Sequence, residues 1–262
     1  MGQVQAWSFL YGTDMQPTSV SRNNTCERRV VAIIPAAGLG QRMGSSTHKQ
    51  YLRLDEAPIL VHSLRTFAAH PAIDEIIIVA SADQLDFCRW DIVHAYSIDK
   101  VCAVVRGGAQ RQDSVRNGLR ACQCSADDII LIHDGVRPLV DTKTIDAVIA
   151  GVQEHGACIA AVPVKDTLKT VHNGMIESTP ERSNLWAAQT PQGFRCNLIA
   201  NAHEQALAHG LSATDDASVL EKYGHPVAIV EGSYANLKIT TPEDLILAQA
   251  LLRERSSKSE QI

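Results

Sequence analysis

Continuous apolar segments and segments with helical periodicity alternate along most of this chain. Residues 30–34 (Val-Val-Ala-Ile-Ile) are all apolar and mostly β-branched, which is typical of a parallel strand covered on both faces. We expect this strand to end at Pro35, because proline cannot donate a hydrogen bond to a neighbouring strand. Similar segments predict strands at residues 75–80, 101–105, 129–133, 157–162 and 227–230.

Helical patterns lie between these strands. Leu60, Leu64 and Phe67 recur on one helical face, and Pro58 suits the first turn of that helix. Further helices are expected over about 84–97, 141–155 and 195–209, near Ser114, from Asp216 and from Pro242. The alternation predicts an α/β protein with a doubly wound, mainly parallel, Rossmann-like sheet. Ligands of such sheets sit beyond the carboxyl ends of the strands.

One region departs from this rhythm. Residues 166–189 lack a helical period, and Asn173-Gly174 lies between two short segments. Asn-Gly is a strong signal for a two-residue β-hairpin turn. We therefore expect a protruding hairpin arm, which could act as a lid or as a dimerisation element.

The two ends of the chain are polar. Residues 1–28 show no clear period and carry no Lys or Arg before Arg22, so a secretory signal is not expected. We interpret 1–28 as a disordered or extraneous extension, 29–254 as one domain and 255–262 as a polar tail.

Composition narrows the functional classes. Hydrophobic residues make up 45% of the 262 positions, and the formal net charge of −5 argues against a general nucleic-acid binder. No segment is long and apolar enough to span a membrane. The seven cysteines are scattered without a C-x-x-C pair. This predicts reduced, mostly buried thiols in a cytosolic protein, and neither a disulfide nor a zinc framework.

The loop after the first strand combines small residues with positive charge. Small residues let backbone N–H groups approach an anion, and Arg42 and Lys49 add two cations. This composition suits a polyphosphate. The small residues are Ala36, Ala37, Gly38, Gly40 and Gly44.

Two other interpretations of this loop remain open. The spacing of Gly38, Gly40 and Gly44 could belong to a dinucleotide-binding turn. The loop is long for such a turn, and its two cations exceed what a helix N-terminus already supplies. A purely structural loop is the other alternative.

The ends of two later strands carry further candidates. After residues 101–105, Gly107, Gly108, Arg111 and Ser114 suit nucleotide contacts. A glycine turn followed by a helix capped by Asp113 or Ser114 would explain the same residues equally well.

Asp134 follows the strand at 129–133. A carboxylate at the tip of a buried strand is suited to bind Mg²⁺ or to accept a hydrogen bond from a substrate hydroxyl. The alternative is a structural pair between Asp134 and Arg137. We interpret His133 as a packing residue.

Taken together, these and later motifs resemble those of 2-C-methyl-D-erythritol 4-phosphate cytidylyltransferases over about residues 29–253. The chain departs from the family pattern at His48, where proline is usual, and at Gly135 and Val136, where alanine is usual. The motifs are Pro35-Ala-Ala-Gly-Leu-Gly-x-Arg42-Met-Gly with Lys49-Gln-Tyr-Leu, Gly107-Gly-x-x-Arg111-x-x-Ser114-Val, His133-Asp-x-x-Arg137-Pro, Leu185-Trp-x-x-Gln-Thr190-Pro-Gln-x-Phe, Thr214-Asp-Asp-Ala-Ser and Asn236-x-Lys238-x-Thr-x-Pro-x-Asp-Leu.

The resemblance implies a nucleotidyltransferase of isoprenoid precursor biosynthesis. The phosphate of 2-C-methyl-D-erythritol 4-phosphate would attack the α-phosphorus of CTP with Mg²⁺, giving 4-diphosphocytidyl-2-C-methyl-D-erythritol and pyrophosphate. It also implies a homodimer joined through the arm. The composition described above predicts a cytoplasmic location without nucleic-acid or membrane partners.

The resemblance also assigns roles to residues. The implied catalytic residues are Arg42, Lys49 and Lys238. The implied nucleotide-binding residues are Pro35, Ala36, Ala37, Gly38, Gly40, Gly107, Gly108, Ser114, Asp134 and Gly135. The implied substrate-binding residues are Asp134, Arg137, Thr167, Arg182, Thr190 and Thr214, with Asp134 also a metal ligand. From the sequence alone, Arg182 would otherwise be a solvated charge on the arm.

Three other functions stay open at this point. A related enzyme could transfer cytidylyl to another polyol phosphate, such as ribitol 5-phosphate. An NAD(P)-dependent oxidoreductase would use the glycines of the first loop. A non-catalytic regulator would bind CTP without turnover, although Arg42, Lys49 and Lys238 argue against it.

Overall fold

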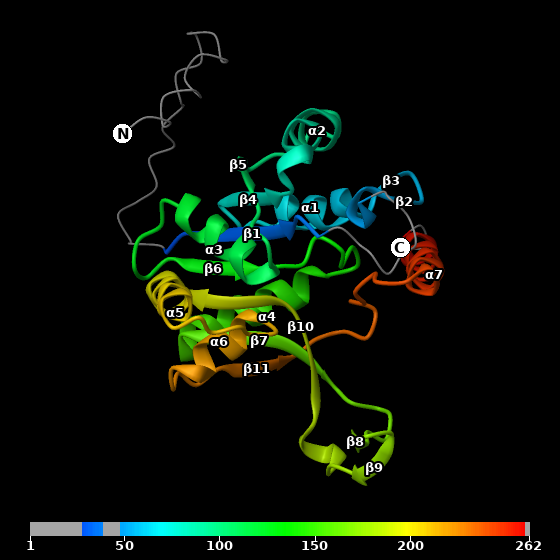
Figure 1. Cartoon of the computed structure of the whole chain (residues 1–262). Helices are drawn as coiled ribbons and strands as arrows, with labels where there is room; N and C mark the ends of the chain where they lie inside the picture. The colour runs from blue at the N-terminus through cyan, green and yellow to red at the C-terminus, as the bar shows by residue number, and fades with distance from the viewer. Residues whose placement is uncertain (1–27, 39–47, 260–262) are drawn as a thin grey trace, which may run out of the picture.

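A seven-stranded sheet forms the centre of the protein (Figure 1). The computed structural model describes residues 28–38 and 48–259. The strand order is β11-β7-β10-β6-β1-β4-β5, and only β10 runs antiparallel to its neighbours. This confirms the predicted α/β class with a mainly parallel sheet. The strands are β1 (Val30–Ala36), β4 (Glu75–Ala80), β5 (Val101–Arg106), β6 (Ile129–Ile132), β7 (Ala157–Pro163), β10 (Trp186–Arg195) and β11 (Ala228–Glu231).

Two small two-stranded sheets and the helices complete the described part. The small sheets are β2 (Arg53–Leu54) with β3 (Ala57–Pro58), and β8 (Thr170–His172) with β9 (Met175–Ser178). The α-helices are α1 (Ile59–Ala69), α2 (Leu85–Phe87), α3 (Arg111–Ala121), α4 (Thr142–His155), α5 (Cys196–Ala208), α6 (Asp216–Lys222) and α7 (Pro242–Ser259). None of the helices in these ranges is both long and apolar enough to cross a membrane.

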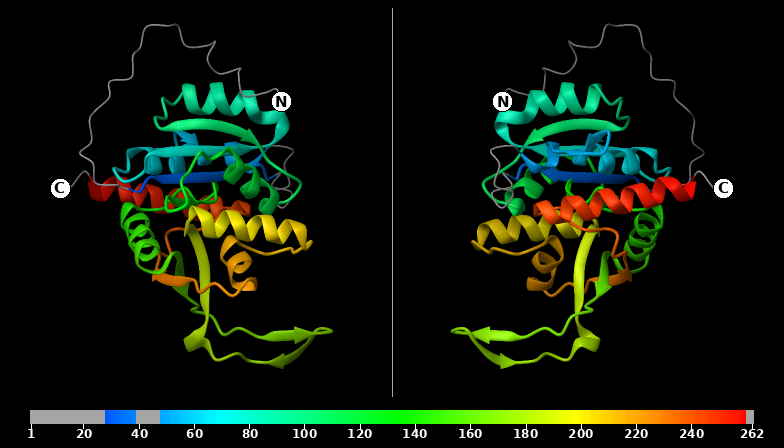
Figure 2. Two further views of the ribbon diagram at one scale, coloured as in Figure 1. Left: turned by 90° about the vertical axis from the view of Figure 1, so that its left-hand side faces the viewer. Right: turned by 90° about the vertical axis from the view of Figure 1, so that its right-hand side faces the viewer.

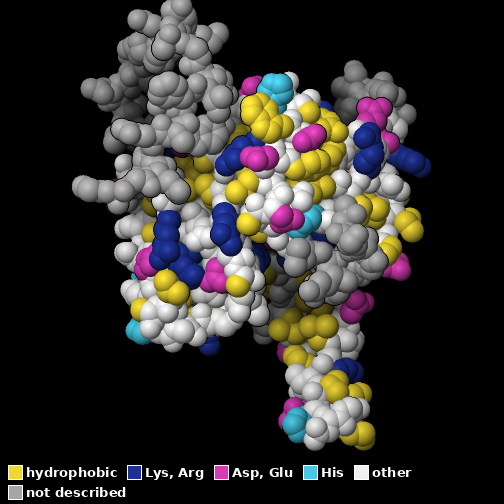
Figure 3. All heavy atoms as spheres, turned by 45° about the horizontal axis from the view of Figure 1, so that its top comes forward, with side chains coloured by type: hydrophobic (Ala, Val, Ile, Leu, Met, Phe, Trp, Pro, Cys, Tyr) yellow, Lys and Arg dark blue, Asp and Glu magenta, His cyan; other side chains and the backbone are white. Residues whose placement is uncertain are grey.

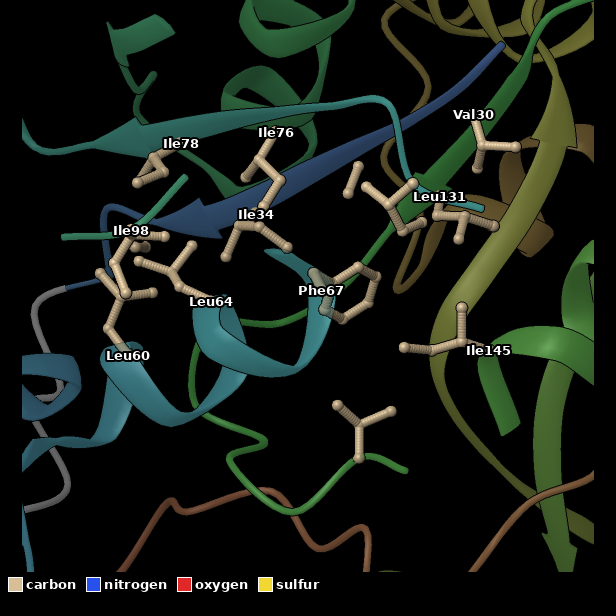
Figure 4. Close-up of a cluster of buried hydrophobic side chains, with 14 of the residues drawn as sticks. Val30, Ile34, Leu60, Leu64, Phe67, Ile76, Ile78, Ile98, Leu131 and Ile145 are labelled. Atoms are coloured by element: carbon tan, nitrogen blue, oxygen red, sulfur yellow. The ribbon is translucent and has the colours of Figure 1, made fainter. Parts of the chain in front are cut away.

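Both faces of the sheet are buried. Side chains alternate along β1, so Ala32 and Ile34 belong to one core cluster, and Val31 and Ile33 to another. Apolar residues of α1 and α4 complete the first cluster, where Leu64 and Phe67 pack beneath Ile34 (Figure 4). Residues of α3, α5 and α6 complete the second. Burial on both faces explains why the parallel strands are continuously apolar.

Two proline positions differ from expectation. β1 continues through Pro35 to Ala36, and Pro35 lies opposite Val79 in the parallel register. Its carbonyl still accepts a hydrogen bond from the Gly135 N–H at 3.2 Å, so the missing donor does not end the strand. Pro58 is the N-cap of α1, one residue before the first turn in which we expected it.

The sequence pattern did not predict β10. Residues 190–193 (Thr-Pro-Gln-Gly) are not apolar, and proline is unusual in a central strand. The register on β7 shifts between Ala188 and Gln192, which accommodates this irregular stretch. The strand that returns from the arm therefore lies in the middle of the sheet, between β7 and β6.

Two helical predictions also changed. The segment predicted as one helix over 84–97 consists of α2 followed by a π-helical stretch at Cys88–His94. At the other end, α7 runs to Ser259, into the segment that we expected to be a polar tail.

The prediction that the cysteines are unpaired thiols was wrong for one pair. Cys124 and Cys196 form a disulfide across 72 residues. Two backbone hydrogen bonds join the same segments, the turn before β6 and the start of α5. Cys196 N donates to Asp128 O at 2.8 Å, and Asn197 N donates to Ala126 O at 3.1 Å. Cys88, Cys102, Cys122 and Cys158 are free thiols, and of these Cys102 is exposed.

The predicted arm is present as β8 and β9, joined at Asn173 and Gly174, which both have positive φ. It projects well away from the body of the protein (Figure 2). Pro163 pairs with Trp186, and Val164 N donates to Leu185 O at 3.0 Å, so the two ends of the arm meet at a closed stem.

Candidate active site

A cavity of about 800 Å³ lies at the carboxyl ends of β1, β4, β5 and β6. Most residues predicted to bind a nucleotide lie along it, together with both of the predicted catalytic lysines. Those lining residues are Pro35, Ala36, Ala37, Gly38, Lys49, Gly107, Gly108, Ser114, Asp134 and Lys238. The predicted residues Gly40 and Arg42 lie outside the described residues.

One wall of this cavity is the turn between β5 and α3. A side chain at Gly107 would bring its Cβ within 2.5 Å of the Ala37 Cβ, so the turn packs closely against the end of β1. Gly108 N donates to Ser114 Oγ at 3.1 Å, which fixes the turn on α3. The N-cap of α3 is Gln110, with Asp113 closing a capping box; Asp113 and Ser114 therefore lie inside the helix, three and four residues after the cap.

Lys49 also lines this cavity. It begins a short 3-10 turn, Lys49–Tyr51, in which Gln50 is buried and donates from Nε2 to the carbonyl of Ala36. This bond ties the turn to the end of β1. The structure thereby holds a cation at the edge of the cavity.

Asp134 is the centre of charge in the site. Its Oδ1 accepts from Arg111 Nε at 2.9 Å, while Oδ2 lies 2.9 Å from Lys238 Nζ and 3.8 Å from Arg137 Nε. Burial raises the pKa of Asp134, but these three cations outweigh burial and hold that pKa far below its usual range. Asp134 is therefore ionised at neutral pH.

A chain of neutral hydrogen bonds supports the same loop. The Arg137 carbonyl can only accept, so His133 donates to it from Nε2 at 3.1 Å. His133 Nδ1 then accepts from the Thr190 hydroxyl at 3.1 Å, and that hydroxyl oxygen accepts from Asp134 N at 3.1 Å. Burial lowers the pKa of His133 to about 4, so this histidine is neutral at pH 7. This agrees with its expected packing role.

A second cavity of about 150 Å³ adjoins the first. Four predicted substrate-binding residues line it: Asp134, Arg137, Thr190 and Thr214. Arg137 is fixed by donation from Nη1 to Asn236 O at 2.7 Å. The two cavities share Arg111, Asp134 and Lys238. These three side chains therefore lie at the boundary between the cavities, where a ligand in one would contact a ligand in the other.

The remaining predicted residues lie elsewhere. Thr167 and Arg182 are exposed on the arm, and Arg182 donates from Nη1 to Lys165 O at 2.7 Å. Within this chain the arm projects away from the body of the protein (Figure 2), and neither residue lines either cavity. Gly135 lines neither cavity; its Cβ would lie 2.8 Å from Leu60 Cδ1, so its small size serves packing.

The sequence patterns did not predict the full role of several residues of the site. The sequence motif suits Arg111 to a nucleotide contact, but it does not predict the bond to Asp134, because 23 residues separate them. Ser81 and Arg106 line the larger cavity and follow or end β4 and β5. Their position at strand ends was the available signal.

The arrangement is suited to hold two anionic groups side by side. Lys49, Lys238 and Arg111 place positive charge along a cavity whose other walls present turns with small residues. Such a site favours transfer of a phosphate-containing group, because fixed cations stabilise charge that develops between two anions.

Comparison with known proteins points to one family. The family whose sequence profile matches residues 30–254 is described as 2-C-methyl-D-erythritol 4-phosphate cytidylyltransferase. A protein of that name from Syntrophotalea carbinolica is 54% identical over 223 residues, covering 85% of this chain and 96% of the relative. One from Geobacter metallireducens is 49% identical over 228 residues, covering 86% and 98%.

Solved structures agree with these sequence matches. The 4-diphosphocytidyl-2C-methyl-D-erythritol synthase of Anaerococcus prevotii superposes with a TM-score of 0.75 at 34% identity, covering 86% of this chain and 99% of that one. The 2-C-methyl-D-erythritol 4-phosphate cytidylyltransferase of Francisella tularensis gives 0.73 at 32% identity, covering 85% and 99%.

Proposed function

Because the chain belongs to the family of 2-C-methyl-D-erythritol 4-phosphate cytidylyltransferases, we propose that it transfers cytidylyl from CTP to 2-C-methyl-D-erythritol 4-phosphate. The products are 4-diphosphocytidyl-2-C-methyl-D-erythritol and pyrophosphate. The observation that carries the proposal is the pair of adjoining cavities that share Asp134, Arg111 and Lys238. The larger cavity suits the nucleotide, and the smaller suits the sugar phosphate.

The reaction needs little proton transfer. The substrate phosphate is already anionic at neutral pH, so its oxygen can attack the α-phosphorus directly while the bond to the pyrophosphate oxygen breaks. The main barrier is to bring two anions together and to stabilise the charge as it is redistributed. Lys49 and Lys238 carry out this task in our proposal, with Arg42 added on the sequence resemblance alone.

The donor set fits a magnesium ion shared with the nucleotide. Mg²⁺ commonly binds one or two carboxylates and completes its shell with phosphate oxygens and water. Asp134 provides a carboxylate in the larger cavity, and the described residues contain no cluster of three or more acidic, His or Cys side chains that would hold a metal alone. When bound, Mg²⁺ would neutralise triphosphate charge, while Asp134 would hold it in place.

We further propose that the chain acts as a homodimer joined through the arm. Hydrophobic side chains lie exposed on this arm (Figure 3), including Val171, Met175 and Ile176. Thr167 and Arg182 would contact the sugar phosphate of the partner subunit, which accounts for their distance from the cavities of their own chain. A cytoplasmic location belongs to the same proposal.

The test is pyrophosphate release with Mg²⁺, with each of the four nucleoside triphosphates crossed against methylerythritol phosphate and ribitol 5-phosphate. We expect release only with CTP and methylerythritol phosphate. Release with ribitol 5-phosphate alone would overturn the substrate assignment. No release with any pair, from protein that binds CTP, would favour a non-catalytic regulator.

A further inference from the structure

We propose that His203 and Asp216 position the carboxylate of Asp134, and that they act through Arg111. The inference rests on the proposed function in one respect, because it takes Asp134 to face the substrates. His203 and Asp216 line neither cavity. Both side chains are almost completely buried behind Arg111, His203 on α5 and Asp216 at the start of α6.

Each oxygen of Asp216 has its own charged or polar partner. Oδ2 accepts from Arg111 Nη1 at 2.7 Å, and Oδ1 accepts from His203 Nε2 at 3.2 Å. Burial raises the pKa of Asp216, but Arg111 and His203 outweigh that effect and keep it below the usual range. The buried carboxylate is thus ionised and depends on both partners.

Arg111 links Asp216 to Asp134 in the site. Its guanidinium is planar, and it binds Asp216 from Nη1 and Asp134 from Nε, so two carboxylates fix the plane. Asp134 Oδ1 is held by Arg111, which leaves Oδ2 beside Lys238. A tilt of the guanidinium would therefore rotate the Asp134 carboxylate within the cavity.

The Asp216 side chain is not needed to begin helix α6. Asp215 is the N-cap and accepts from Ser218 N at 3.0 Å. Gln192 Oε1 accepts the backbone N–H groups of Asp216 and Ala217, both at 3.1 Å. The start of the helix is therefore satisfied without this carboxylate, whose two oxygens are directed at Arg111 and His203.

The first test is a double-mutant cycle on kcat/KM. His203→Ala removes the donor to Oδ1, and Asp216→Asn removes the charge opposite Arg111. Partners that orient a site ligand typically matter by about 10- to 100-fold, so we expect each variant to lose about tenfold or more. The double variant should be no slower than Asp216→Asn alone, because His203 acts only through Asp216. Multiplied losses would overturn the proposal.

Two further variants separate positioning from folding. His203→Gln supplies an amide N–H donor in place of the imidazole Nε2–H and should recover most of the loss, whereas the shorter His203→Asn should not. His203→Asn also replaces His203→Ala in the cycle if the alanine variant does not fold. Equal activity of the Gln and Asn variants would contradict the proposal.

His70 provides a matched control. It is also buried, and its Nε2 lies 3.2 Å from Asp146 Oδ1, but it follows α1 at the amino end of β4, away from the cavities. We expect His70→Ala to lower the melting temperature without lowering kcat/KM. If His70→Ala lowers kcat/KM as much as His203→Ala does, the effect is one of general stability and the proposal fails.

A final readout does not depend on activity. The side-chain Nε–H resonance of Arg111, assigned by its loss in Arg111→Lys, should shift in His203→Ala and stay unchanged in His70→Ala. An unchanged Arg111 resonance in His203→Ala would overturn the proposal that His203 acts on Arg111 through Asp216. Absence of pyrophosphate release by the wild-type protein would instead overturn the proposed function, and the resonance would still test the link from His203 to Arg111.

Discussion

Lys49 is the single residue on which the proposed chemistry depends most clearly. It lines the larger cavity from a turn that Gln50 ties to the end of β1. Loss of one preorganised transition-state donor typically costs about 100-fold or more in turnover. We expect Lys49→Ala to lower kcat at least about 100-fold while CTP affinity changes much less.

Steady-state kinetics and a CTP titration on the same protein measure the two effects. Lys143→Ala is the control, because Lys143 is exposed on α4 outside both cavities. Near-normal turnover of Lys49→Ala would remove the central support for the mechanism.

His133 gives a prediction about pH. Burial lowers its pKa from 6.5 to about 4, so between these values the unfolded chain binds a proton that the folded chain does not. This contribution to stability is complete above pH 6.5 and is lost as the pH falls towards 4, with a slope of up to about 1.4 kcal/mol per pH unit.

Urea unfolding of the wild type and His133→Gln at several values between pH 4 and 7 measures this slope. The variant should show a shallower loss of stability with acid. His172→Gln, which changes an exposed histidine of the arm, should keep the wild-type slope. Identical slopes for His133→Gln and the wild type would contradict the prediction.

At the residue level, the sequence was a good guide to positions and a poor guide to partnerships. Lys49, Ser114, Asp134 and Lys238, which belong to different motifs, lie along one cavity. The pairing of Arg111 with Asp216 could not be predicted from the sequence, because 105 residues separate them and neither residue type specifies a partner.

Among the elements, β10 and α4 pack at a distance that only glycine allows. A Cβ at Gly193 would lie 2.7 Å from methyl groups of both Val148 and Val152 on α4. Overpacking of this kind typically costs about 1–3 kcal/mol. We expect Gly193→Ala to lower the free energy of unfolding by that amount, measured by urea titration.

A second substitution tests the cause. Val148→Ala removes one of the two clashing side chains, so adding it to Gly193→Ala should cost much less than Val148→Ala costs in the wild type. Simple addition of the two losses would show that the helix–strand contact is not responsible.

The parallel strands were predictable because burial on both faces makes each one continuously apolar. The apolar pattern did not predict β10, because its middle residues, Gln189 to Gly193, are polar, proline or glycine. These residues lie in the sheet because they serve the site: Gln192 caps α6, and Thr190 supports the Asp134 loop. The sequence did not predict the disulfide either, because only the tertiary fold brings Cys124 and Cys196 together.

For the whole molecule, the main prediction concerns assembly. Ile176 is 65% exposed on the arm, where burial against a second copy would stabilise a dimer. We expect light scattering to give the mass of two chains for the wild type and of one chain for Ile176→Asp, because a carboxylate is costly to bury in an apolar contact.

Ile246→Asp is the matched control. Ile246 is 68% exposed but lies on α7, away from the arm, so this variant should keep the wild-type mass. A wild-type protein that scatters as a monomer at assay concentration would contradict the proposed dimer.

The closed stem of the arm has a consequence for how this fold can be modified. Since Pro163 pairs with Trp186 and Val164 bonds to Leu185, everything beyond the stem forms an insert whose ends already meet. We therefore expect the seven-stranded sheet to set its register without that insert. The arm can therefore be shortened, exchanged or replaced by a tight turn as a modular unit, which would allow the folding of one chain and the pairing of two chains to be engineered separately.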